Sequence, residues 1–313
     1  MWLVGIDEAG YGPNLGPFVM SAVACRVPAP APTCLWQSLG SAVRRAGDKR
    51  DARLVIDDSK RVYSSGQSLA GLERGLRALL GPWPETLDGL MARLAPADLA
   101  DLRQECWYTG QTPLPTVAAA TEDAARLEAF ARACEQAQVR PWSLRSVVVC
   151  TPRFNQLLQR AGTKSVVLAD AFVRLLHECV AAAPQEEIEV VADKQGGRHA
   201  YQMQIQQAVG GLVRTLEESQ QQSLYEVPRP AAAIRVRFLP RADAANLCVA
   251  AASMLSKYVR ELLMSEFNRF WCERVPGLAP TAGYPGDAPR YLQAILAEAK
   301  RLNLSRSAVW RER

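Results

Sequence analysis

The sequence predicts an α/β protein, because segments with the period of a β-strand are interspersed with segments that have the period of an α-helix. Short apolar runs, most of them rich in β-branched residues, predict strands over 2–8, 18–25, 147–150, 188–192 and 234–239. Apolar residues spaced three or four positions apart predict helices over 69–80, 121–138, 165–182, 247–263 and 289–302. With 313 residues, the chain can form one large domain or two ordinary ones around a substantial core.

Composition narrows the class of protein. The sequence holds no window of about 18 apolar residues and opens without a signal-peptide pattern, so we expect a cytoplasmic protein with no membrane partner. The eight cysteines lack any CxxC pair, which favours free thiols in a reducing compartment over disulfides or zinc. Two histidines argue against a histidine triad, and a net charge of +5 is compatible with a phosphate-bearing partner.

The first predicted strand carries two adjacent acids, Asp7 and Glu8, and then breaks into a turn that holds three glycines and two prolines. Adjacent residues of a strand point to opposite faces, so both acids can serve one site only where the strand ends and its backbone can bend. A carboxylate beside an apolar core is costly unless it is paired or bound to a metal. The pair indicates a basic partner or a cation, with a solvated acidic turn as the alternative.

Two further acids stand at comparable places in the chain. The strand over 188–192 ends at Asp193 and is followed by Gly196 and Gly197, which repeats the order of apolar strand, acid and glycine turn. Asp243 precedes the long helix, where an acid can also be a cap that offsets the helix macrodipole. These residues alone leave both interpretations of Asp243 open.

The remaining patterns concern organisation rather than chemistry. The proline-rich segment 27–32 predicts a surface connector, and residues 56–61 predict a short polar turn. Residues 82–142 are rich in Ala, Leu, Arg and Glu and predict a helical insertion. The alternation over 234–239 predicts an edge or half-exposed strand. The closing helix is expected to pack one face beside the core, formed by Tyr291, Ile295, Leu296 and Ala299.

Several of these segments together resemble a known family, the type 2 ribonucleases H (ribonuclease HII). The likeness is collinear over residues 1–26, 54–80 and 145–285. It rests on Gly5-Ile6-Asp7-Glu8-Ala9-Gly10-x-Gly12-Pro13, on Asp58-Ser59-Lys60, on the strand that ends at Asp193, and on Asp243 ten residues before Ser253 in Ala250-Ala251-Ala252-Ser253-Met254-Leu255-Ser256-Lys257.

The resemblance implies a fold and a domain organisation. The fold would be a ribonuclease-H-like mixed sheet flanked by helices, with a helical C-terminal portion. Residues 1–270 would form the catalytic core, with the helical insertion at about 82–142. Residues 271–313 would form a helical extension packed on that core.

The resemblance also implies a reaction. The family's four catalytic carboxylates correspond to Asp7, Glu8, Asp193 and Asp243, which would hold Mg²⁺ or Mn²⁺, two ions in all, since hard oxygen ligands suit these metals. The implied activity is hydrolysis of the RNA strand of RNA/DNA hybrids, or cutting at ribonucleotides in duplex DNA, with 5′-phosphate and 3′-hydroxyl products. We expect a monomer whose partner is that nucleic acid.

Substrate contacts follow from the same resemblance. Gly10, Tyr11 and Gly12 stand where the family has Gly-Arg-Gly, and a tyrosine can donate one hydrogen bond or stack but cannot offer a charged fork. Lys60 matches a phosphate-contacting lysine, and Tyr284 matches a tyrosine that stacks on a sugar. The helix motif contributes Ser253 and Lys257, where the lysine could face phosphate or only cover the helix surface.

Two alternatives remain open at this point. A nuclease of the same fold could act on DNA or on a structured nucleic acid, because Tyr11 and the insertion alter the part that selects the substrate. A protein that binds nucleic acid without catalysis is the other, although a binder gains nothing from gathering four mutually repelling acids.

Overall fold

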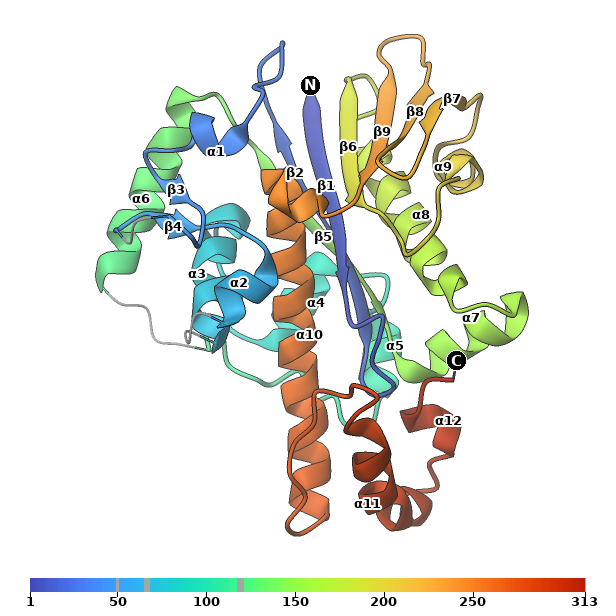
Figure 1. The fold of residues 1–313 in the computed structure, drawn as a ribbon. Helices are drawn as coiled ribbons and strands as arrows, with labels where there is room; N and C mark the ends of the chain where they lie inside the picture. The colour runs from blue at the N-terminus through green and yellow to red at the C-terminus, as the bar shows by residue number, and fades with distance from the viewer. Residues whose placement is uncertain (49–50, 65–67, 117–120, 313) are drawn as a thin grey trace.

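The protein is built around one mixed β-sheet. A computed structural model describes residues 1–48, 51–64, 68–116 and 121–312. Within these residues, seven strands form a sheet in the order β5-β2-β1-β6-β9-β8-β7 (Figure 1). The strands are β1 (Trp2–Ala9), β2 (Phe18–Arg26), β5 (Trp142–Val149), β6 (Ile188–Asp193), β7 (Arg214–Glu218), β8 (Ser223–Val227) and β9 (Ile234–Leu239), while β3 (Val43–Arg44) and β4 (Leu54–Val55) pair separately.

The centre of the sheet joins both strand directions. β1 pairs antiparallel with β2, as the predicted hairpin requires, and parallel with β6. β6 in turn pairs parallel with β9. The prediction of an edge strand over 234–239 is wrong, because β8 covers the other side of β9, although the strand keeps its alternating burial. The mixed sheet expected from the family resemblance is confirmed.

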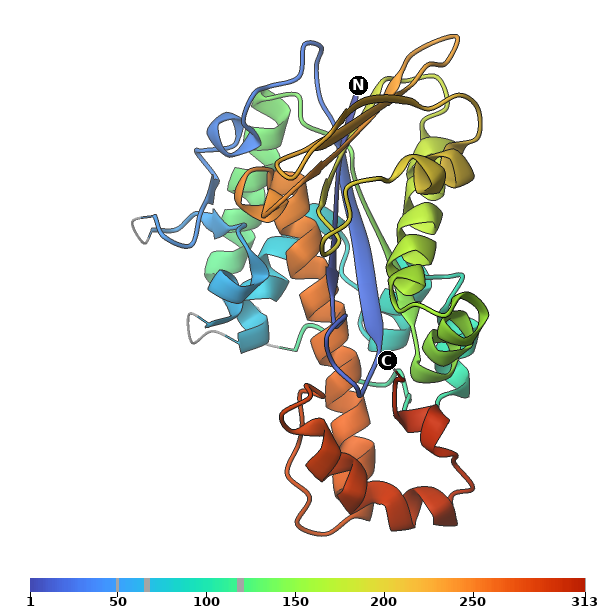
Figure 2. The same ribbon diagram turned by 45° about the vertical axis from the view of Figure 1, so that its right-hand side comes forward.

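Helices cover both faces of this sheet. They are α1 (Leu35–Ser38), α2 (Ser59–Ser64), α3 (Ser68–Leu80), α4 (Leu87–Leu94), α5 (Leu99–Gln104), α6 (Thr121–Gln136), α7 (Thr151–Ala161), α8 (Ser165–Ala182), α9 (Gln202–Val209), α10 (Leu247–Arg274), α11 (Ala288–Arg301), α12 (Arg306–Val309) and the 3₁₀ turn η1 (Ala242–Ala244). Leu3 packs in a core with α10 and α3, whereas Val4 and Ile6 pack in a second core with α8 and α9. Figures 1 and 2 show these two layers on opposite sides of β1.

The long helix α10 lies directly against β1. A Cβ atom added at Gly5 would come within 2.1 Å of the backbone carbon of Cys248, so the strand and the helix touch through their backbones. The helix presents small residues here, and Ala250, Ala251 and Ala252 are all fully buried. This close approach brings the start of α10 beside the middle of β1.

The described part of the segment 82–142 contains the helices α4, α5 and α6, separated by irregular stretches such as 105–116; residues 117–120 lie outside the described part. Thr86 caps α4, because its side chain accepts a hydrogen bond from the backbone N–H of Gly89. The segment is tied to α10 by Glu266, whose buried carboxylate accepts hydrogen bonds from the backbone N–H groups of Thr109 and Gly110. The predicted helix over 121–138 ends at Gln136, two residues early.

The C-terminal part packs at the far end of α10 (Figure 1). In α11, Tyr291, Ile295 and Ala299 are buried as predicted, but Leu296 is 38% exposed, so its expected place in the core is wrong. The chain then returns to the sheet, where Arg311 donates hydrogen bonds to the carbonyl oxygens of Gly10 and Gly16.

Other local expectations need correction. Residues 56–61 are not only a turn, because α2 already begins at Ser59. The strand predicted over 147–150 is longer, since β5 begins at Trp142. Helix α7 was not predicted, although Pro152 stands in its first turn, where proline suits a helix start.

Two predictions concern the whole chain. All eight cysteines, each of them in the described part, are free thiols. Among the described helices, none combines the length and apolar character needed to span a bilayer.

Candidate active site

Asp7 and Glu8 lie where β1 has lost one of its two neighbours. The ladder between β1 and β6 ends at the pair Ile6–Ala192, whereas the ladder between β1 and β2 continues to Ala9. The strand therefore runs on past Glu8, and it is the neighbouring strand β6 that stops. This opens one edge of β1, which gives side chains from both faces access to the same space.

Asp193 and Asp243 meet at the end of β6. One carboxylate oxygen of Asp193, Oδ1, accepts a hydrogen bond from the backbone N–H of Ala242, with an N–O distance of 3.0 Å. Asp243 follows in η1 and bonds the N–H of Ala244. The N-cap of α10 is instead Asn246, so the alternative that Asp243 only caps the long helix is wrong.

The four carboxylates perturb one another electrostatically. Burial, and next the charge of Glu8, raise the pKa of Asp7 well above its usual range. Burial followed by the charge of Asp193 raises the pKa of Glu8 to about 7. Burial also raises the pKa values of Asp193 and Asp243, and the charges of Asp58 and Asp193 add to the effect on Asp243. Residues far apart in the sequence are thus gathered within reach of each other's charge.

Lys60 supplies positive charge to this cluster. It is exposed on the first turn of α2, and its charge lowers the pKa values of Glu8, Asp193 and Asp243 against the larger effect of burial. The backbone N–H of Lys60 donates to the carboxylate of Asp58, which fixes the start of the helix. The lysine is therefore placed beside the carboxylates by the beginning of α2.

The carboxylates do not form a ready-made ligand set. In the described part of the chain, no three Asp, Glu, His or Cys side chains are arranged so that they could hold one metal ion. The donor type nevertheless suits a hard divalent cation, because the site consists of carboxylate oxygens whose charges raise one another's pKa values. Side chains would have to rotate towards a common point for such an ion to bind.

Two buried arginines, Arg260 and Arg311, contact the glycine turn after β1. Gly10 has a φ of +85°, and a Cβ atom there would lie 2.4 Å from Nε of Arg260. Arg311 donates to the carbonyl oxygen of Gly10 over 2.6 Å and to that of Gly16 over 2.7 Å. Burial, and next the charge of Arg260, lower the pKa of Arg311 to about 9. The guanidinium groups of Arg260 and Arg311 therefore fix the turn in place and bring positive charge to it, beside the carboxylates.

Tyr11 and Tyr284 provide aromatic surface around this turn. Tyr284 is 49% exposed, and a Cβ atom on Gly12 would lie 3.9 Å from its ring. The ring of Tyr11 is half-buried, packs edge-on against Phe18 and lies 4.9 Å from the ammonium of Lys164. The structure thus brings Gly10, Tyr11, Gly12 and Tyr284 into one neighbourhood.

The two predicted residues of the helix motif face different partners. Ser253 is buried, donates to the hydroxyl of Ser59 on α2 and lies near enough to Asp7 to lower the pKa of that carboxyl against the larger effect of burial. Lys257 places its ammonium 2.7 Å from the carboxylate of Glu261 and 4.6 Å from the ring centre of Tyr63. Both partners of Lys257 come from the protein itself.

Three basic residues near the site were not singled out from the sequence. Arg260 lies seven positions after Ser253, which is two helical turns, so the shared face of α10 could have revealed it. Arg311 and Lys164 are brought in by packing between distant segments, and no local pattern marks them.

Comparison with known proteins bears on the fold. No protein-family model matches the sequence, and no curated protein sequence matches it. Among solved structures, ribonuclease H2 from Pyrococcus horikoshii OT3 matches with a TM-score of 0.51 and 15% identity, over 99% of this chain and 92% of that one. The fold is that of a type 2 ribonuclease H.

Two other structures show a looser likeness to this chain. Ribonuclease HII from Archaeoglobus fulgidus, in a complex with PCNA, has a TM-score of 0.47 and 16% identity, with 100% of this chain and 95% of that one covered. Bst-RNase HIII in complex with Mn²⁺ has a TM-score of 0.41 and 19% identity, with 98% and 63% covered. In this chain, β1, β6 and α10 lie at the centre of the type 2 ribonuclease H fold.

Proposed function

We propose that this chain is a metal-dependent endonuclease that hydrolyses the RNA strand of RNA/DNA hybrids, or cuts at ribonucleotides in duplex DNA. The products would be a 5′-phosphate and a 3′-hydroxyl. One observation carries the proposal: the charge of Asp193 reaches Asp7, Glu8 and Asp243 and raises their pKa values, so acids from three separate segments lie near Asp193. The fold of a type 2 ribonuclease H supports the same reaction class.

The four carboxylates would hold Mg²⁺ or Mn²⁺, two ions in this proposal. When bound, the metal would supply activation of the attacking water and stabilisation of the leaving 3′ oxygen. The acids themselves keep negative charge concentrated at one edge of β1, where a divalent cation would relieve their mutual repulsion. Asp7 and Glu8, whose pKa values are both raised, would be stabilised in their charged forms by such a neighbour.

The surrounding residues would bind and orient the duplex. In this proposal, the glycine turn lets the backbone at Gly10 and Gly12 approach a ribose, and Tyr11 and Tyr284 offer rings for stacking. Lys60 is the exposed cation beside the carboxylates and would contact the phosphate that is cut. Ser253 and Lys257 would act through α2 and Asp7, since their own partners lie inside the protein.

The chain would work as a monomer in the cytoplasm. All the residues assigned to the site come from one copy of the chain, so no second copy is needed to complete it. The eight free cysteines, four of them buried, suit a reducing compartment.

Cleavage of matched duplexes tests the proposal. Three duplexes of one sequence would carry an all-RNA strand, a single ribonucleotide or only DNA, with Mg²⁺ or Mn²⁺ present. We expect cutting of the first or the second and none of the third. Equal cutting of all three would refute the substrate assignment, and no cutting of any would refute the nuclease itself.

Exchange of one carboxylate tests the site. Asp193→Asn keeps an oxygen that can accept the hydrogen bond from Ala242, so the fold should hold, but the charge that couples to the other acids is lost. We expect turnover to fall at least about a hundredfold while duplex binding without metal is retained. Asp287→Asn is the matched control, because Asp287 pairs with Arg290 on the surface and should leave turnover unchanged. Full activity in Asp193→Asn would remove Asp193 from the site.

A second substrate is favoured by one observation. Tyr11 stands where the family has an arginine, and its ring packs against Phe18 and Lys164 instead of offering a guanidinium fork. A nuclease that senses no 2′-hydroxyl at this position would cut DNA as well. The all-DNA duplex in the assay above separates the two substrates.

A further inference from the structure

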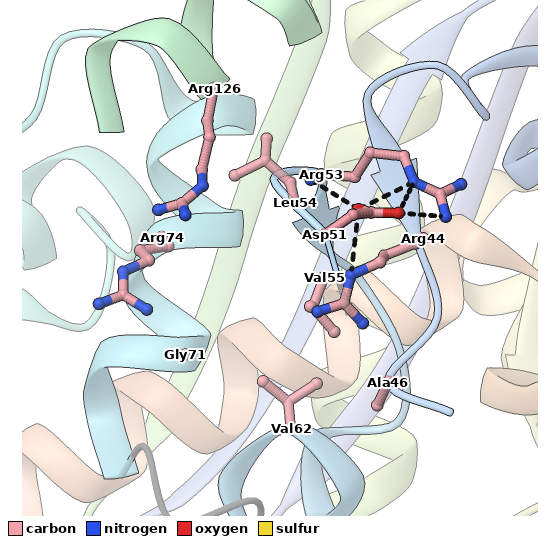
Figure 3. Close-up of a pocket in the computed structure, with 10 residues that line it drawn as sticks. All are labelled: Arg44, Ala46, Asp51, Arg53, Leu54, Val55, Val62, Gly71, Arg74 and Arg126. Atoms are coloured by element: carbon pink, nitrogen blue, oxygen red, sulfur yellow. Dashed lines mark hydrogen bonds and ion pairs between the residues drawn. The ribbon is translucent and has the colours of Figure 1, made fainter. Parts of the chain in front are cut away.

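A cavity lined by arginines lies outside the carboxylate cluster. This cavity, of about 230 Å³, opens between the β3–β4 pair, α2, α3 and α6. Four arginines line it, Arg44, Arg53, Arg74 and Arg126, and Figure 3 shows them around an apolar floor formed by Leu54, Val55 and Val62. None of these residues belongs to the site described above.

The described arginines around this cavity share their carboxylate partners. Among the described side chains, two carboxylates pair with the four arginines. Asp51 lies 2.8 Å from Arg53 and 3.6 Å from Arg44. Asp123 lies 3.1 Å from Arg126 and 3.6 Å from Arg74, and it also faces Arg77. Asp51 therefore lies closer to Arg53 than to Arg44, and an anionic ligand would be favoured beside the guanidinium of Arg44.

Arg44 shows where a ligand would bind. Its side chain is only 10% exposed, yet its buried Nε has no hydrogen-bond partner. One of its terminal nitrogens donates to the backbone carbonyl of Arg45, and the carboxylate of Asp51 lies beyond hydrogen-bonding distance of Nε. A buried donor without an acceptor is costly, and an oxyanion in the cavity would satisfy it.

We propose that this arginine pocket, defined by Arg44, Arg53, Arg74 and Arg126, binds a phosphate group. A guanidinium fork matches phosphate oxygens in pairs, and Arg44, whose buried Nε lacks an acceptor, would make the main contact while the neighbouring arginines add positive charge. The occupant is a backbone phosphate of the nucleic acid that is bound at the carboxylate cluster. That choice of occupant rests on the proposed function, whereas the phosphate site itself does not.

The side chain of Arg45 connects the pocket to the carboxylate cluster. Arg45, the neighbour of Arg44, donates to the carbonyl oxygen of Ala244 over 2.8 Å, and Ala244 directly follows Asp243. Helix α2 contributes Val62 to the pocket and Lys60 to the cluster. A duplex that lies on Lys60 would therefore pass near the pocket.

Calorimetry with inorganic phosphate tests the pocket directly. The protein would be titrated in EDTA, so that neither metal nor catalysis contributes. We expect Arg44→Gln combined with Arg74→Gln to weaken phosphate binding at least about tenfold, and Arg44→Lys to recover only part of it, since lysine keeps the charge but not the fork. Arg132→Gln on α6 is the matched control, because Arg132 pairs with Glu128 on the surface away from the pocket.

Binding of a labelled RNA/DNA duplex in EDTA identifies the source of the phosphate. With a backbone phosphate in the pocket, the double variant should bind the duplex more weakly and show a smaller salt dependence, by about one unit of slope per lost contact. Unchanged duplex binding with weakened phosphate binding would overturn the backbone assignment in favour of a free phosphate ligand.

Three results bear on the site as a whole. Unchanged phosphate binding in the double variant, with its thermal unfolding like that of the parent, would overturn the pocket. If the variant fails to fold, Arg44→Lys alone decides between the outcomes. Loss of phosphate binding in a protein that cuts no duplex would sustain the phosphate site and refute only the proposed nuclease.

Discussion

Gly10 is a residue at which two physical constraints coincide. Its φ of +85° disfavours any side chain, and a Cβ atom would collide with Arg260 and approach the carbonyl oxygen of Pro17 to 2.9 Å. Gly10→Ala should therefore destabilise the fold by about 2–3 kcal/mol, measured by urea unfolding, and weaken duplex binding.

Gly12 provides the control for that change. It lies in the same turn, is exposed, has no positive φ, and a Cβ atom there would meet only the ring of Tyr284 at an ordinary distance of 3.9 Å. Gly12→Ala should change stability by less than about 0.5 kcal/mol. Equal losses in the two variants would show that Arg260 does not constrain the turn.

Glu105 should make stability depend on pH. Burial raises its pKa from 4.5 to about 7, against a hydrogen bond from Trp107. The folded state binds the proton more tightly than the unfolded state, so this stabilisation is full below pH 4.5 and is lost as the pH rises to about 7.

Replacement by glutamine removes that titration while keeping an acceptor for Trp107. At pH 8, Glu105→Gln should be more stable than the parent by about 2 kcal/mol, with the difference vanishing near pH 4. Urea unfolding at a series of pH values measures it. A difference that stays constant with pH would contradict the raised pKa of Glu105.

At the scale of elements, Glu266 fastens the inserted helices to α10. Its carboxylate accepts from Thr109, Gly110 and Thr112, and although burial would raise its pKa, these hydrogen bonds outweigh burial and hold the pKa below its usual value. Glu266→Ala leaves these donors, of which the N–H of Gly110 is buried, without their acceptor and should cost about 3 kcal/mol by urea unfolding.

The surface of the same helix supplies the comparison. Glu273 is 64% exposed and faces only Arg274, at 4.0 Å. Glu273→Ala should therefore cost less than about 1 kcal/mol. If both variants lose equally little, the segment 82–142 is held to α10 by apolar packing instead.

Helices and strands could be predicted where their apolar residues recur with a strong period. Elements with a weak or mixed apolar pattern could not. Helices α3, α8 and α10 were found because their apolar residues recur on one face. Strand β7 was missed because Arg214–Glu218 is wholly exposed and holds a single apolar residue, Leu216. Strand β8 is short, and one of its three buried positions is the polar Ser223, which weakens its apolar signal. The position of β9 in the sheet depends on β8, and therefore could not be predicted either.

At the scale of the whole molecule, Arg311 joins the C-terminal segment to the glycine turn. Its guanidinium is completely buried and donates to the carbonyl oxygens of Gly10, Leu15 and Gly16. Arg311→Met leaves these carbonyls without a partner and should cost about 3 kcal/mol by urea unfolding, with weaker duplex binding.

Arg306 is a suitable comparison, since it is exposed and its guanidinium lies 5.4 Å from the ring of Trp310. Arg306→Met should cost less than about 1 kcal/mol. Equal duplex affinity in the Arg311 variant and the parent would show that the turn keeps its shape without this contact.

The arrangement of the carboxylates was predictable in outline only. Each acid stands near the end of a strand or before a helix, so its local place could be read from the sequence, and the family resemblance joined the four together. Arg311 could not be found in this way, because it bonds Gly16 across 295 positions of sequence. The catalytic roles of the four acids stay a prediction.

The backbone contact between Gly5 and Cys248 sets the distance between Asp7 on β1 and Asp243 before α10. Asp7 lies two residues beyond Gly5, and Asp243 lies just before the helix that Gly5 touches. Any larger residue at position 5 would push α10 away from the sheet. The acids would then lie farther apart, although none of them had been replaced. In a library selected for cleavage, position 5 should reject every substitution, including alanine, while Gly12 accepts many.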